Sequence, residues 1–185
     1  MTLALAKTLP VLLGLGAALG SVNALALPTD RDQPIHIQAD TSQLDDKQGV
    51  AVYVGDVIIT QGSMKITGNK VTVTRDTNGD VKTFTSVGNL AYYEQKPAAD
   101  KPIVQAWAVT IDYLATQDRI ILTDRAKVVN DGNVSTGEKI VYDTVRQVAN
   151  AGRANGSKVT SPQPRIDMVI QPKKKTEPAQ QQKGQ

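Results

Sequence analysis

The sequence predicts an all-β protein built from many short strands, and three observations lead to this prediction. Apolar and polar residues alternate with a period of two, as in "MKITGNKVTVT" (64–74), where Met64, Ile66, Val71 and Val73 stand among lysines and threonines. Runs rich in β-branched residues, which favour pleated strands, are separated at short intervals by turn signals containing glycine, asparagine or aspartate. After residue 26, no segment with helical periodicity extends beyond about one turn.

The first 26 residues are typical of a secretory signal peptide. Lys7 is their only charge, an apolar run follows, and Ala24–Ala26 matches an A-x-A cleavage pattern. The run is about a dozen residues long, whereas a helix needs roughly 20 to cross a bilayer. We therefore expect cleavage after Ala26 and a mature protein in the periplasm. The chain contains no cysteine, which excludes a diacylated lipoprotein and disulfide bonds.

The strands expected in the body of the chain follow one another with turns between them. In "WAVTIDY" (107–113) the alternation places Trp107, Val109, Ile111 and Tyr113 on one face. The segment Glu94–Pro102 is interpreted as a long hairpin loop rather than a domain linker. Other strands are expected around Ile35–Ile37 and in 50–60, 64–74, 118–124 and 135–142, with turn signals at 47–49, 55–56, 61–62, 77–80, 131–132 and 155–156.

A weak internal repeat relates the two halves of the body. The segment "ITGNKVTV" (66–73) matches "STGEKIVY" (135–142), and each is preceded by a strand pair. Repeated short strands indicate either a solenoid-like stack or a jellyroll, in which neighbouring strands bury one another's apolar faces.

The distribution of charge argues against a nucleic-acid partner. The formal net charge is +3, and the terminal segment 171–185 carries four lysines and one glutamate. A nucleic-acid groove would place basic residues on the folded body, interleaved with aromatics. We interpret 27–170 as a single folded domain and 171–185 as a disordered polar and basic tail.

Catalytic and metal-binding patterns are scarce. His36 is the only histidine, it alternates with Ile35 and Ile37, and no G-x-S-x-G motif accompanies it, so we expect it at the surface. The nearby aspartates lack the spacing of a calcium loop, and zinc would need further ligands. We therefore expect no enzyme activity, no metal and no cofactor.

The apolar residues of the body are mostly Val, Ile and Leu, and two interpretations remain open on pattern alone. They form either an ordinary sandwich core or the wall of a lumen that holds something long and aliphatic. Small β-branched walls leave a groove more readily than Phe and Trp do. Each acyl CH₂ buried there would contribute about 0.8 kcal/mol.

Several segments together resemble the periplasmic lipopolysaccharide-transport bridge proteins, the LptA or OstA-like family. The segments are "DQPIHIQAD", "LDDKQGVAVYVGDVIITQGSMKITGNKVTVTR", "VQAWAVTIDYLATQDRIILTD" and "STGEKIVYD", within residues 32–169. The resemblance implies a V-shaped β-jellyroll of antiparallel strands around an open apolar groove that binds the lipid A part of lipopolysaccharide. It also implies head-to-tail homo-oligomers that link an inner-membrane extraction complex to an outer-membrane translocon through related jellyroll domains.

The resemblance and the alternation together suggest which residues line the groove. Ile35 and Ile37 fall at the family's groove entrance, and Tyr93 and Tyr113 match groove-facing positions in the middle. The alternation extends this set to Tyr53, Met64, Ile66, Val71, Val73, Ile111 and Ile121. Two other functions stay open: an adaptor that joins partner proteins by edge-strand pairing, and a β-solenoid polysaccharide enzyme with a convergent carboxylate pair.

Overall fold

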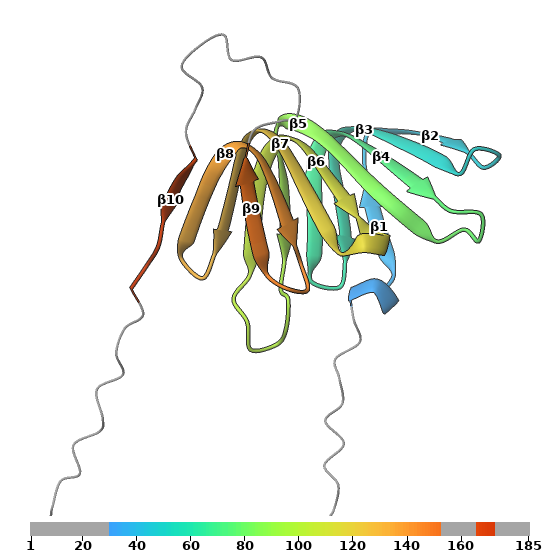
Figure 1. Ribbon diagram of the computed structural model, residues 1–185. Helices are drawn as coiled ribbons and strands as arrows, with labels where there is room; N and C mark the ends of the chain where they lie inside the picture. Colours follow the sequence, from blue (N-terminus) through green and yellow to red (C-terminus); the bar gives the residue numbers. More distant parts are fainter. Residues whose placement is uncertain (1–29, 153–165, 173–185) are drawn as a thin grey trace, which may run out of the picture.

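The computed structural model describes residues 30–152 and 166–172, which form an antiparallel β-structure (Figure 1). Two single-turn 3₁₀ segments, η1 (Asp30–Asp32) and η2 (Ala115–Gln117), accompany the strands. The expected signal peptide and most of the expected tail lie outside the described residues. The strands are β1 (Ile35–Gln38), β2 (Thr41–Asp45), β3 (Val50–Gln61), β4 (Met64–Arg75), β5 (Val81–Gln95), β6 (Val104–Leu114), β7 (Arg119–Asn130), β8 (Asn133–Asp143), β9 (Val148–Gly152) and β10 (Asp167–Val169).

All described strands belong to one sheet with the order β1-β3-β4-β5-β6-β7-β8-β10. Consecutive strands from β3 to β8 pair antiparallel, and β5 and β6 form the hairpin expected around 94–102. At one end β1 and β2 pair with different halves of β3, and at the other β9 and β10 pair with different halves of β8. The all-β prediction is confirmed, and the fold is an open jellyroll whose two ends are not joined.

Each of the six central strands consists of two short strands joined by a bend. β3 and β4 match the expected 50–60 and 64–74 to within one residue, whereas β7 extends six residues beyond the expected 118–124. Gly55 and Asp56 have positive φ and lie within β3, so they form a bend and not the turn expected there. Asp124 and Arg125 also have positive φ, and they form the corresponding bend in β7. The ladders shift register at neighbouring points across the sheet: Val54/Val57, Thr67/Lys70, Val87/Ala91, Trp107/Thr110 and Thr123/Ala126.

The line of bends divides the curved sheet into two wings. The β1–β10 wing contains β1, β10, residues 57–67, 91–108 and 126–137, and the β2–β9 wing contains β2, β9, residues 50–54, 70–87, 110–123 and 139–143. A bulge inserts an extra residue and bends a strand toward one face. The concave faces of the wings therefore point toward each other.

The bends also change which residues of a strand face inward. In β6, Ala106 and Ala108 are buried before the bend, and Ile111 and Tyr113 are buried after it. Trp107 therefore faces outward with Tyr92 and Lys127, its partners in the neighbouring strands. The expectation that Trp107 shares a face with Ile111 and Tyr113 was wrong, because the register shift at 107–110 interrupts the alternation.

The repeated T-G-x-K segments coincide with the bends of β4 and β8. Gly68 and Gly137 occupy equivalent places in these two strands. At Gly68 a Cβ would lie 2.3 Å from Ser86 Oγ and 2.9 Å from the Val87 carbonyl oxygen, so the neighbouring strand comes too close for any side chain. Ser86 Oγ donates a hydrogen bond of 2.9 Å to the Thr67 carbonyl, which holds it in that position. The internal repeat therefore marks the bend.

Replacing Gly68 should destabilise the protein, although its φ suits other residues. We expect Gly68→Ala to lower the free energy of unfolding by about 1–3 kcal/mol, because Ser86 and the backbone of Val87 must move. Gly152→Ala is the matched control, since a Cβ there meets nothing within 4 Å. Urea denaturation of the two variants gives the comparison, and equal stability of the Gly68 variant and the unmodified protein would contradict this account.

Candidate functional site

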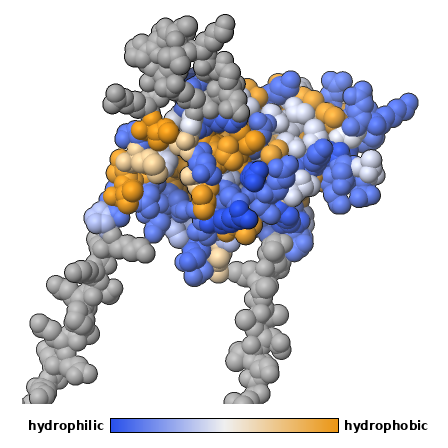
Figure 2. All heavy atoms as spheres, viewed as in Figure 1, coloured by the Kyte–Doolittle hydropathy of each residue, from blue (hydrophilic) through white to orange (hydrophobic). Residues whose placement is uncertain are grey.

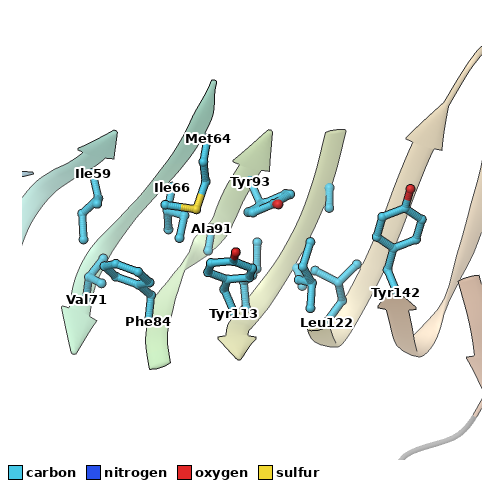
Figure 3. Packing of buried hydrophobic residues seen from close by; sticks show 14 of the residues in the cluster. Ile59, Met64, Ile66, Val71, Phe84, Ala91, Tyr93, Tyr113, Leu122 and Tyr142 are labelled. Carbon is cyan, nitrogen blue, oxygen red and sulfur yellow. The ribbon is translucent and has the colours of Figure 1, made fainter. Parts of the chain in front are cut away.

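The space between the wings is lined by apolar side chains. Figure 3 shows them in two facing rows, with Met64, Ile66 and Tyr93 in one and Val71, Phe84 and Tyr113 in the other. Valine and isoleucine, which pack well on a pleated surface, make up ten of the 21 buried residues described in this cluster. Among the described residues the buried polar ones are Ser86 and Ser135, so no Asp or Glu is buried as a whole residue, although Glu138 Oε2 is shielded from solvent.

Ten of the eleven residues expected to line the groove lie on this interior face. Ile35, Ile37 and Tyr53, from β1 and β3, are partly buried and pack against the cluster at its N-terminal end. The other seven are buried: Met64, Ile66, Val71, Val73, Tyr93, Ile111 and Tyr113. The structure therefore brings these ten residues together, whereas their contact with a lipid stays a prediction.

The eleventh residue, Ile121, lies on the outer face. It pairs with Asp112 and Val141, while Ile120 and Leu122 on either side of it are fully buried. In the run Ile120-Ile121-Leu122 every position is apolar, so alternation cannot show which positions face inward. The sequence prediction also omitted other residues of the interior. Many of them come from runs in which neighbouring positions are all apolar, or are isolated apolar positions; examples are Val57, Ile59, Phe84, Ile120, Leu122, Ile140 and Tyr142.

Four of the buried side chains described in this interior are aromatic: Phe84, Tyr93, Tyr113 and Tyr142. The Tyr113 ring lies 6.2 Å from the Phe84 ring and 5.9 Å from the Tyr93 ring, measured between centroids. The Tyr93 hydroxyl donates to Gln95 Oε1, whereas the buried Tyr142 hydroxyl has no hydrogen-bond partner among the described residues. The tyrosine hydroxyls thus add polar groups to a surface that is mostly apolar.

Burial dominates the ionisation of these tyrosines. It raises the pKa of Tyr93 well above its ordinary value and raises the pKa of Tyr142 to about 12, because a phenolate there would lose its hydration. Burial also raises the pKa of Tyr113, and the neighbouring Arg31 guanidinium opposes that rise. All three hydroxyls therefore stay protonated near neutral pH.

The interior opens at the mouth, the side of the jellyroll opposite the bends. A cavity of about 940 Å³ extends from Gln95–Ala99 to Thr144–Gln147, with Tyr113 in its wall. A second cavity, of about 520 Å³, lies toward the N-terminal end and is lined by Ile35, Phe84 and Tyr113. The 3₁₀ segment η1 lies between them, and Arg31 borders both. Deeper in the interior the side chains are 0–6% exposed, so packing fills the space between the wings there.

The outer surface carries few features of a catalytic or metal site. His36 is exposed on the outer face of β1, opposite to Ile35 and Ile37, as the sequence indicated. In the described part of the chain, no three His, Cys, Asp or Glu residues are grouped to hold a metal ion. The same residues include no helix with the length and apolarity needed to cross a membrane.

Exposed apolar residues gather near the C-terminal edge of the sheet. Four residues in β10 or next to it are 47–75% exposed: Ile166, Met168, Val169 and Ile170. Figure 2 shows apolar atoms on this side, near β8 and β10. At the opposite edge Leu44, in β2, is 57% exposed. Strand edges with exposed apolar side chains favour pairing with another chain.

The fold and the interior define an antiparallel β-jellyroll with an apolar interior that opens along one side. Residues 36–148 match the family model described as LptA/(LptD N-terminal domain) LPS transport protein. The chain belongs to this family, and the resemblance seen in the sequence is confirmed.

Relatives of known name agree with this assignment. The chain is 65% identical over 171 residues to the lipopolysaccharide export system protein LptH of Pseudomonas aeruginosa, covering 92% of this chain and 98% of the relative. It is 36% identical to LptA of Escherichia coli K12 over 143 residues, 76% of each chain. The crystal structure of LptH, described as the LptA-homologous periplasmic component of the lipopolysaccharide transport device, superposes with a TM-score of 0.72. The LptH sequence in that structure is 63% identical to this chain, and the superposition covers 78% of this chain and 100% of the LptH chain.

The buried tyrosines predict a loss of stability at alkaline pH. Well below pH 10 they are neutral in the folded and unfolded states and favour neither. As the pH rises from about 10 toward 12, the unfolded chain loses phenolic protons before the folded chain does, so the free energy of unfolding falls. Urea denaturation across this range should show the fall, and Tyr142→Phe should reduce it. A tyrosinate absorbance titration that ends near pH 10 in folded protein would contradict the prediction.

Proposed function

We propose that the protein is a periplasmic carrier of lipopolysaccharide that holds the lipid A acyl chains between the two wings. The observation that carries the proposal is the facing pair of aliphatic surfaces, which opens to solvent at the mouth. The names of the relatives, lipopolysaccharide export system proteins, supply the ligand. Burial contributes about 0.8 kcal/mol per CH₂, so several methylenes of one acyl chain would bind usefully.

The proposed role needs no chemical step. The protein moves a lipid by exchanging contacts with water for contacts with aliphatic side chains, and the affinity follows from the area buried. Loading from an inner-membrane extraction complex and delivery to an outer-membrane translocon then require only that each partner offer a similar surface. No cofactor or metal takes part in this proposal.

Edge pairing is the second part of the proposed function. The sheet ends at β1 and β2 on one side and at β9 and β10 on the other, so its two edges differ. A contact between unlike edges is heterologous and continues from copy to copy, which gives head-to-tail stacks. Related jellyroll domains of inner- and outer-membrane components would pair with the terminal copies by the same β-augmentation.

The adaptor function is the competing candidate, and the tight packing of the deep interior favours it. In that case the interior is an ordinary core and the protein acts through its edges alone. The two candidates differ in one measurable respect, which is whether lipid enters the space between the wings.

A photo-crosslinking residue in β1 separates the two functions. We expect the photoreactive amino acid p-benzoylphenylalanine at Ile37, which faces inward, to form lipopolysaccharide adducts in cells. The same probe at His36, which faces outward on the same strand, is the matched control and should give none or few. Adducts are detected by immunoblotting for the protein and for lipopolysaccharide. Protein adducts alone at Ile37 would support the adaptor and overturn the carrier.

A charge at the N-terminal edge should weaken stacking. We expect Leu44→Lys, in β2, to raise the concentration needed for self-association several-fold, because a lysine on an edge strand opposes pairing with another strand. Ile103→Lys is the control, since Ile103 is 51% exposed in the β5–β6 loop, away from both edges. Sedimentation velocity at increasing concentration measures the effect. Equal self-association of the two variants would show that the β2 edge is not the contact.

A further inference from the structure

The N-terminal segment lies across the mouth and contacts both wings through adjacent residues. On one side the Asp30 carboxylate accepts three hydrogen bonds, from Ser63 N at 2.8 Å, Ser63 Oγ at 2.7 Å and Gln95 Nε2 at 2.7 Å. Ser63 and Gln95 belong to the tip of the β1–β10 wing. Asp30 therefore fastens the segment to that wing.

Arg31 reaches the other wing. Its guanidinium donates to the Ala115 carbonyl oxygen and forms an ion pair with the Asp118 carboxylate. Ala115 and Asp118 belong to the connection between β6 and β7, at the tip of the β2–β9 wing. Because Asp30 and Arg31 are neighbours in the chain, the two sets of contacts together join the wing tips across the mouth.

The two attachments differ in how easily they separate. The segment continues directly into β1, and Gln61 Nε2 donates to the Arg31 and Gln33 carbonyls at 3.0 and 3.1 Å, so it must follow the β1–β10 wing. By contrast, the side chains of Arg31 and Asp118 are 45% and 38% exposed. An ion pair so exposed is screened by water and salt and contributes little. The contact that breaks first is therefore the one between Arg31 and the β2–β9 wing.

The segment is also connected to the interior. Gln95 accepts a hydrogen bond from the buried Tyr93 hydroxyl through Oε1 and donates to Asp30 through Nε2. Arg31 lies beside Tyr113, whose ring packs against that of Tyr93. A guest that displaces the Tyr93 or Tyr113 ring therefore disturbs the contacts of Asp30 or Arg31.

We propose that Asp30–Asp32 is a latch on the mouth of the groove, and that acyl chains enter and leave when Arg31 releases Ala115 and Asp118. Arg31 borders both mouth cavities, so its release joins them into one opening. The proposal rests on the carrier function, because it describes how that same groove admits its ligand. In this proposal Arg31 and Asp118 control how fast acyl chains enter and leave the groove, in addition to any effect on the affinity for lipid.

The first test measures how fast an apolar guest enters. N-phenylnaphthylamine is a neutral dye that fluoresces in apolar surroundings, so its entry does not depend on attraction between Arg31 and a charged headgroup. By stopped flow, we expect Arg31→Ala and Asp118→Asn each to speed entry and release by about three- to tenfold. Arg75→Ala is the matched control: it removes the Arg75–Asp46 ion pair of 2.9 Å, which lies within one wing, and should leave the rates unchanged.

The second test closes the latch. The chain has no cysteine, so Arg31→Cys and Asp118→Cys can be joined selectively by a short bis-methanethiosulfonate linker whose disulfides are cleavable. We expect the cross-link to slow dye entry at least tenfold and dithiothreitol to restore it. The same linker between Asp46→Cys and Arg75→Cys is the control, and it should have no effect.

The outcomes separate the latch from the carrier function. Faster entry in both single variants, together with reversible slowing by the 31–118 cross-link, supports the latch. Unchanged rates in the single variants, or undiminished entry into the cross-linked protein, overturn it. Lipopolysaccharide binding by the unmodified protein is measured in parallel by co-purification, and its absence would overturn the carrier function whatever the dye shows.

Discussion

The structure depends on one constraint, which is that every central strand bends at the same level of the sheet. A flat sheet with this sequence would expose one apolar face along its whole length. The bends at 54–57, 67–70, 87–91, 107–110 and 123–126 fold that face against itself. Because the strands are hydrogen-bonded to their neighbours, a bend in one of them requires a bend in the next. Gly68, which permits the close approach of Ser86 and Val87, therefore serves the whole sheet and not β4 alone.

The same constraint explains how much of the fold and site the sequence could predict. Composition, alternation and turn signals were sufficient for the all-β class. Because alternation is regular within each half-strand, it also placed six residues on the interior face: Tyr53, Met64, Ile66, Val71, Val73 and Ile111. The other four interior positions, Ile35, Ile37, Tyr93 and Tyr113, came from the family resemblance. Alternation failed at Ile121 because every residue of the run Ile120–Leu122 is apolar, and it failed at Trp107 because of a bend. In β6 the bend changes the parity of the inward positions, whereas in β7 it does not, because Asp124 and Arg125 absorb the extra residue with positive φ. A single sequence does not show which strand of a pair carries the bulge. It therefore does not determine which residues face inward beyond a bend.

Leaving the sheet open has a consequence for its edges. A closed barrel would pair every strand, but here β1 and β2 end one side and β9 and β10 end the other. Each edge is made of two short strands, one in each wing, so a partner that pairs with both would continue both wings and the interior between them. An apolar path longer than one molecule is then a result of edge pairing. The exposed apolar residues around β10 lie where such a partner would cover them.

The contacts that close the mouth are of a different kind from those that form the interior. The interior buries aliphatic surface, a stabilisation that no single contact controls and that salt hardly changes. The segment Asp30–Asp32 contains no buried residue and is held by hydrogen bonds and an exposed ion pair. Side chains that are 0–6% exposed leave no room for a guest, so a guest must either enlarge the space or enter where the structure yields most easily. That place is the mouth, because breaking a few solvent-exposed polar contacts costs less than separating two packed apolar faces along their whole length.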